Sequence, residues 1–223
     1  MSRTADEPIM RLAIEQRSGS QPARIHIIGG PGSGKSTLSR QIAQRLDAPV
    51  FELDHIAGAG PAPAFRMERS LSQRLDDVER IAALSTWITE GSFLWWTEAL
   101  LRAADIIVWL DLPLSVAMRR IVTRHIREYL GDIAQQSSLR QKLQVLRYPH
   151  LRHLAQFVPY TTQYYRRLTS DESAGERDLD SGWALTRAET ASWLEGFASK
   201  VIRCSQPIDV EHLLTHLTAS RPV

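Results

Sequence analysis

The chain has 223 residues, a length that fits one α/β domain with an appendage. Its net charge of +2 gives no global argument for binding to nucleic acid or to a membrane surface. The one cysteine, Cys204, excludes an intrachain disulfide framework and favours a reducing compartment. No apolar run reaches the length of a membrane span, and residues 1–22 lack the apolar core of a secretory signal. We therefore expect a cytoplasmic protein with no membrane partner and a flexible N-terminal extension.

Apolar runs alternate with helical patterns from Arg24 onward. The run Ile25-His26-Ile27-Ile28 predicts a buried strand, and apolar residues at helical spacing over 36–46 predict the helix that follows. Further strands are expected at 50–53, 86–89, 106–110 and 201–204, and further helices at 71–84, 116–129 and 208–217, with one more starting from the capping-box residues Thr186 and Glu189. Strands separated by helices are typical of βαβ units, so the sequence predicts a three-layer α/β fold around a five-stranded parallel sheet.

The segments between these elements differ in composition. Residues 57–65 are rich in glycine, alanine and proline and predict a loop. The periodic pattern loosens over 127–168, where Pro149 and Pro159 interrupt it. Residues 169–182 are polar enough to predict an exposed insertion.

The segment between the first strand and the first helix matches the phosphate-binding pattern G-x-x-x-x-G-K-[ST], and we call residues 29–37 the P-loop. Its glycines let successive backbone N–H groups approach phosphate oxygens, and the following helix presents its positive N-terminus to the same anion. Lys35 is expected to reach the β- and γ-phosphates, and the Ser36 hydroxyl to bind Mg²⁺. A dinucleotide site matches less well, because it has no use for the Gly-Lys-Ser ending. The sequence therefore predicts a nucleoside triphosphate site, with ATP and Mg²⁺ as cofactors, whose binding residues are Gly30, Pro31, Gly32, Ser33, Gly34, Lys35, Ser36 and Thr37.

Three acidic residues follow predicted strands, at the edge where parallel sheets bind their ligands. Asp54 is predicted to orient an acceptor hydroxyl or take its proton, and Glu90 to hold Mg²⁺ through water. For Asp111 a cap of the next helix, through Asp111-Leu112-Pro113, is favoured over a role in the site.

A row of arginines follows the fourth strand. Arg120, Arg124 and Arg127 have the i, i+4, i+7 spacing of one helix face. Such arginines could clamp the transferring phosphoryl group, a contact worth about 10³–10⁵ in rate in phosphoryl-transfer systems. The alternative is a solvated basic face with Arg124 paired to Glu128. Spacing alone leaves both interpretations open.

With these motifs in place, the stretch 24–217 resembles the adenylate kinase-like P-loop kinases, and among them the bacterial topology modulation (FlaR-like) proteins. The resemblance rests on four segments in the same order and spacing: the P-loop, Glu52-Leu53-Asp54, Trp87-Ile88-Thr89-Glu90-Gly91, and the segment from Ile107 to Pro113 that leads to Arg120 and Arg124. It implies one P-loop NTPase domain over 23–218, with a helical lid after the fourth strand at about 125–168.

The resemblance also implies roles for residues. Arg120 and Arg124 match the lid arginines that contact phosphates, so the expected catalytic set is Lys35, Asp54, Arg120 and Arg124. Glu90 matches the acidic residue after the third strand, which organises the metal or its water. The Asp-Gly-Phe-Pro-Arg signature of AMP-binding adenylate kinases is absent, which argues against AMP as the acceptor.

The expected function is therefore an ATP-dependent kinase that phosphorylates an unknown small-molecule acceptor, with nucleosides and nucleotides among the candidates. The alternative is a nucleotide-dependent regulatory ATPase that acts through a protein or DNA partner, for which the low net charge gives weak support. A GTPase is disfavoured, because the Asn-Lys-x-Asp base-reading motif is missing.

Overall fold

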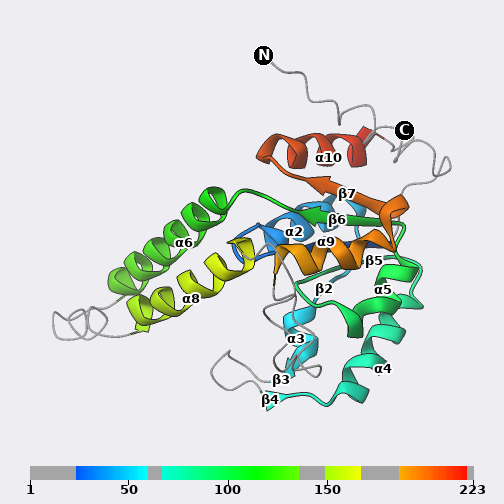
Figure 1. The fold of residues 1–223 in the computed structure, drawn as a ribbon, viewed down its shortest axis with the longest axis horizontal. Helices are drawn as coiled ribbons and strands as arrows, with labels where there is room; N and C mark the ends of the chain where they lie inside the picture. Colours follow the sequence, from blue (N-terminus) through cyan, green and yellow to red (C-terminus); the bar gives the residue numbers. More distant parts are fainter. Residues whose placement is uncertain (1–23, 60–66, 136–148, 167–185, 220–223) are drawn as a thin grey trace.

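The computed structural model describes residues 24–59, 67–135, 149–166 and 186–219. Its central sheet has five parallel strands in the order β2-β5-β1-β6-β7, which confirms the predicted sheet (Figure 1). The strands are β1 (Arg24–Gly29), β2 (Val50–Glu52), β5 (Trp87–Gly91), β6 (Ile106–Leu110) and β7 (Val201–Cys204). A separate two-stranded antiparallel ribbon joins β3 (Gly58–Ala59) to β4 (Met67–Glu68). The predicted loop over 57–65 is therefore wrong at β3 and at Ala57, which ends a helix, and residues 60–65 lie outside the described residues.

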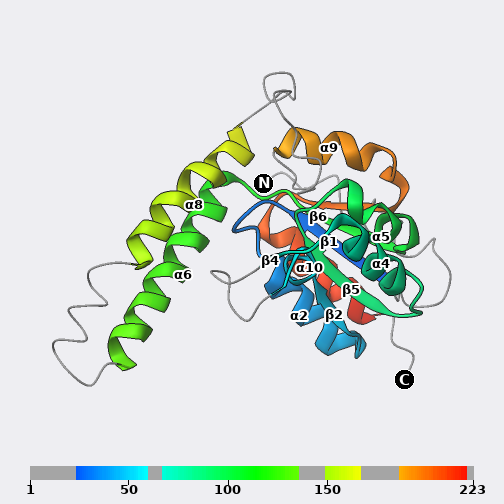
Figure 2. The ribbon, with the colours of Figure 1, turned by 90° about the horizontal axis from the view of Figure 1, so that it is seen from below.

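Helices cover both faces of the sheet and complete the three layers (Figure 2). Ile25 and Ile27 of β1 pack with α2 and α10 on one face, whereas Ile28 packs with α4, α5 and α9 on the other. The helices are α2 (Lys35–Leu46), α3 (Leu53–Ala57), α4 (Leu71–Ala82), α5 (Glu98–Ala103), α6 (Leu114–Gln135), α8 (Pro149–Arg166), α9 (Arg187–Glu195) and α10 (Pro207–Ala219), with 3-10 turns at Trp95–Thr97 and Ala198–Lys200. No helix in the described ranges has the length and hydropathy needed to cross a membrane.

The helices after β6 are longer than their sequence patterns indicated. The helix predicted at 116–129 extends from Leu114 to Gln135, and Pro159, predicted to interrupt structure, lies inside α8. Helices α6 and α8 lie side by side and project from the sheet as a helical arm (Figures 1 and 2). The expected N-terminal extension and the polar insertion over 169–182 lie outside the described residues.

A histidine is buried at the centre of the sheet. His26 on β1 is fully buried, and its Nδ1 lies 2.8 Å from the Thr89 hydroxyl on the neighbouring β5. Burial lowers the pKa of His26 to about 4, because the charged imidazolium loses its hydration there. His26 is therefore neutral in the folded protein near neutral pH.

This burial predicts a pH dependence of stability. Because the pKa of His26 is lower in the folded chain than its ordinary value near 6.5, the folded state resists protonation. The resulting stability is complete above that ordinary value and is lost as the pH falls towards about 4. We expect the free energy of unfolding in urea to fall less steeply for His26→Gln than for wild type across this interval. Equal slopes for the two proteins would contradict the burial argument.

Candidate nucleotide-binding site

The P-loop connects the end of β1 to the start of α2, as predicted. Gly32 and Gly34 have φ angles of +72° and +98°, in the left-handed region that favours glycine. Gly34 is the N-cap of α2, and its carbonyl accepts hydrogen bonds from the N–H groups of Thr37 and Leu38. The loop therefore curls directly into a helix N-terminus, the arrangement that binds phosphate.

Lys35 folds back over this loop. Its Nζ donates to the carbonyls of Gly29 at 2.8 Å and Gly30 at 3.3 Å. Burial lowers the pKa of Lys35, while the charges of Glu90 and Asp54 act in the opposite direction. The ammonium group is thus held against the P-loop. An anion bound beside it would stabilise its buried positive charge.

Ser36 and Glu90, the two predicted metal residues, are in direct contact. The Ser36 hydroxyl donates to Glu90 Oε1 at 2.7 Å, and Glu90 is 3% exposed at the end of β5. Burial raises the pKa of Glu90, opposed by the Ser36 hydrogen bond and the Lys35 charge. Within the described ranges, no group of three or more His, Cys, Asp or Glu side chains could hold a metal by itself. The pair fits a Mg²⁺ ion that arrives with its nucleotide, because Mg²⁺ takes one or two protein oxygens plus phosphates and water.

Asp54 lies in a short helix, not at a strand end. The strand predicted over 50–53 ends at Glu52, and Leu53 begins α3, which places Asp54 in its first turn. The physical reason is packing: Leu53 is fully buried against Gly91, where an added Cβ would come within 2.8 Å of Leu53 Cβ. Asp54 still lines the same cavity as Lys35, and its charge acts on the pKa values of Lys35 and Glu90.

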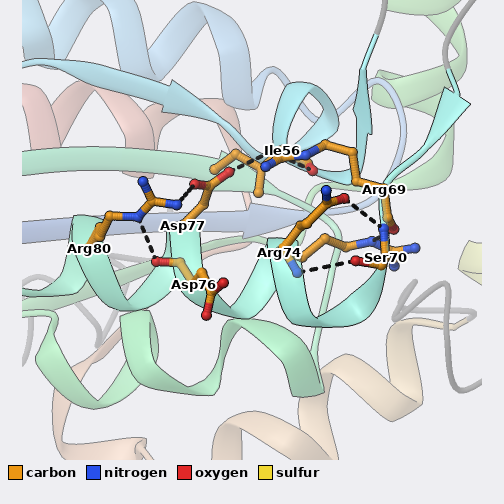
Figure 3. Close-up of polar contacts among 8 residues, drawn as sticks. Ile56, Arg69, Ser70, Arg74, Asp76, Asp77 and Arg80 are labelled. Carbon is orange, nitrogen blue, oxygen red and sulfur yellow. Dashed lines mark hydrogen bonds and ion pairs between the residues drawn. The ribbon is translucent and has the colours of Figure 1, made fainter.

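Arg69 forms hydrogen bonds to the C-terminal end of α3 (Figure 3). Its backbone N–H donates to the Ala57 carbonyl at 3.1 Å, and its guanidinium donates to the Ile56 carbonyl at 3.4 Å and pairs with Asp77 on α4. The buried Arg74 in turn donates to the Arg69 carbonyl at 2.8 Å. Carbonyls at a helix end lack helical partners, so these bonds stabilise α3 and fix the helix that carries Asp54.

Arg120 and Arg124 reach the site from α6. Arg120 donates to the Ser33 carbonyl of the P-loop, and both arginines line the cavity with Arg127. Arg124 Nε also lies 3.8 Å from Glu128 Oε1 in an exposed pair. The expected pair with Glu128 is therefore present, and the role of Arg124 as a phosphoryl clamp stays a prediction.

Asp111 does not cap the next helix, so that prediction is wrong. Its carboxylate is buried and pairs with Arg187 at the start of α9 and with Arg203 on β7, whereas α6 begins only at Leu114. The hydrogen bond that Arg187 donates to the Asp111 carboxylate raises the pKa of Arg187. Asp111 therefore joins α9 and β7 and does not start the nearby helix.

One cavity of about 970 Å³ connects these groups. It runs from Pro207 and Glu211 on α10, past the P-loop and the α6 arginines, to Asp54. Its volume is at the upper end of the range for small-molecule sites. Ser92 and Tyr160 also line it and were missed from the sequence. Ser92 directly follows the strand that ends in Glu90-Gly91, and its position after a parallel strand was a signal for a site residue. Tyr160 has no neighbouring motif that indicates a binding role.

Comparison with known proteins yields weak but related matches. No family model matches the chain. The shikimate kinase of Neisseria meningitidis serogroup C (strain 053442) is 30% identical over 146 residues, which cover 60% of this chain and 85% of that enzyme. The uncharacterised protein YqaC of Bacillus subtilis (strain 168) is 26% identical over 110 residues, which cover 49% of this chain and 60% of YqaC, less than two thirds of its length.

Among solved structures, a gluconokinase from Sinorhizobium meliloti 1021 aligns with a TM-score of 0.42 at 18% identity, over 89% of this chain and 93% of that chain. Because this score is low, the fold assignment rests on the strand order and on the P-loop.

The contact between the P-loop and α8 can be tested at Gly30. An added Cβ there would lie 2.3 Å from the Tyr164 ring, so we expect Gly30→Ala to lower the free energy of unfolding by about 1–3 kcal/mol, the usual cost of overpacking. Gly131→Ala is the matched control, because a Cβ there meets nothing within 4 Å and α6 should gain about 0.5–1 kcal/mol. Thermal or urea unfolding measures both. A Gly30→Ala protein as stable as wild type would show that the loop is not confined by Tyr164.

Proposed function

The chain belongs to the P-loop kinase family that includes the shikimate kinases, and we propose that it transfers the γ-phosphoryl group of ATP to a small-molecule acceptor. The observation that carries this proposal is that Lys35, Asp54 and Arg124 line a single cavity, although they come from three separate elements. A nucleotide-binding switch needs the P-loop but has no need of a carboxylate across the cavity from it.

The nucleotide side of the site would be held by the P-loop. Lys35 would exchange the carbonyls of Gly29 and Gly30 for phosphate oxygens, and Ser36 with Glu90 would hold Mg²⁺. Bound Mg²⁺ would neutralise charge on the β- and γ-phosphates.

Transfer would rely on groups that face the γ-phosphate position. The guanidinium groups of Arg120 and Arg124 would stabilise charge on the moving phosphoryl group, and the bond from Arg120 to the Ser33 carbonyl would hold the first of them beside the P-loop. Asp54 would orient the acceptor hydroxyl and take its proton as the new O–P bond forms. Shikimate is one candidate acceptor, because it is the substrate named for a relative; nucleosides and nucleotides are others.

Three finer assignments belong to the same proposal. We propose that the helical arm (α6 and α8) is the lid, because it carries the arginines that line the cavity. We propose membership of the topology modulation (FlaR-like) group from the four matching sequence segments. We propose a cytoplasmic location, because a buried free thiol, Cys204, suits a reducing compartment.

The test is ADP release by the purified protein with Mg²⁺-ATP and a panel of acceptors that includes shikimate, gluconate, nucleosides and nucleoside monophosphates. Asp54→Asn should reduce transfer by about 10²–10⁴-fold while nucleotide affinity is retained, because only the proton acceptor is lost. Arg124→Ala should reduce kcat by about 10³-fold. Arg102→Ala is the matched control, since Arg102 also forms an exposed i,i+4 pair, with Glu98, but lies outside the cavity lining.

Full transfer activity in both Asp54→Asn and Arg124→Ala would refute the assigned roles. ATP hydrolysis without transfer to any acceptor, combined with salt-dependent retention of DNA, would instead support the regulatory ATPase.

A further inference from the structure

Three tyrosines lie on the last two turns of α8, near the P-loop. Tyr160 and Tyr164 are spaced i, i+4 and therefore share a helix face, and Tyr165 is adjacent. Tyr164 and Tyr165 are 2% and 8% exposed, and Tyr160 is half-buried. A helix that projects from the domain thus has a well-packed base.

Two of these tyrosines fix that base against the P-loop. The Tyr164 ring lies over Gly30, and its hydroxyl is 3.1 Å from the Thr190 hydroxyl on α9. The Tyr165 hydroxyl donates to the Pro31 carbonyl at 3.4 Å. The distance from the end of α8 to the phosphate site is therefore set by direct contacts.

Tyr160, one turn earlier, enters the cavity. It lines the same cavity as Lys35, Asp54 and Glu90. Burial raises the pKa of Tyr160, and the neighbouring Tyr164 and the charge of Asp54 raise it further, so the phenol keeps its proton. A neutral O–H donor and a carboxylate acceptor thus line the same cavity.

We propose that Tyr160 is a specificity-determining residue of the acceptor subsite, where its phenol O–H donates to an oxygen next to the acceptor's reacting hydroxyl. Asp54 accepts from the reacting hydroxyl, so the two side chains together select a polyhydroxylated acceptor, with at least two neighbouring oxygen groups. A neutral donor suits this task because it binds an ether, hydroxyl or carboxylate oxygen without adding charge to a cavity that already holds several arginines. This inference rests on the proposed kinase function.

The experiment compares wild type with Tyr160→Phe on the acceptor that the ADP-release panel identifies. One lost hydrogen bond should raise the acceptor KM by about tenfold, while the KM for ATP stays within about twofold. Tyr129→Phe is the matched control, because Tyr129 is on the other helix of the arm and outside the cavity lining, so both KM values should stay at the wild-type level. A deoxy analogue, which lacks the neighbouring oxygen, should show equal KM values for wild type and Tyr160→Phe.

Each outcome decides one of the two proposals. An unchanged acceptor KM in Tyr160→Phe, or an equal rise in the KM for ATP, overturns the role of Tyr160 and leaves the kinase function standing. If no panel member is phosphorylated, calorimetry in the presence of ADP measures the binding of shikimate and gluconate directly. Binding that weakens about tenfold in Tyr160→Phe supports the subsite while the kinase function fails. Absence of binding to wild type overturns the proposed acceptor class.

Discussion

The close packing of the helical arm against the P-loop is the constraint on which the rest of the site depends. A Cβ at Gly30 would come within 2.3 Å of the Tyr164 ring, one at Gly32 within 2.7 Å of the α6 backbone, and one at Gly34 within 2.9 Å of Arg120. At Gly30 and Gly32 the neighbouring helices thus leave no room for a side chain, whereas at Gly34 the nearest atoms belong to the flexible end of Arg120. The base of the arm therefore packs directly against the loop that would hold the nucleotide.

The part of the cavity that Asp54 lines is held by a different framework. Asp54 lies on a five-residue helix, too short to be stable alone, and Arg69 ties the end of that helix to Asp77 on α4. Arg120 is instead held by the Ser33 carbonyl. Asp54 and Arg120 thus line one cavity but are anchored separately. The distance between the Asp54 carboxylate and the Arg120 guanidinium therefore depends on the positions of both α4 and α6. That arrangement suits catalysis, which needs reacting groups within a few tenths of an ångström of their working positions.

Local patterns and long-range contacts explain which features could be predicted from the sequence. The parallel sheet and the P-loop were predictable because apolar runs and glycine spacing are visible within a few residues. The capping role predicted for Asp111 was wrong because its partners, Arg187 and Arg203, follow 76 and 92 residues later. The predicted strand over 50–53 was one residue too long, because Leu53 fits a strand or a helix equally well. Packing of Leu53 against Gly91 places it in α3. Contacts between residues far apart in the chain produce no local sequence pattern from which they could be predicted.

The hydrogen bonds of the site bear on how a nucleotide would enter it. Lys35 is bonded to the carbonyls of Gly29 and Gly30, and the Ser36 hydroxyl to Glu90, so each group expected to meet phosphate or metal already has a protein partner. These partners avoid the cost of buried polar groups without hydrogen bonds. Nucleotide binding is then an exchange of partners more than a gain of new bonds. Burial lowers the pKa of Lys35, and a phosphate anion beside its ammonium group would offset the cost of keeping that charge buried.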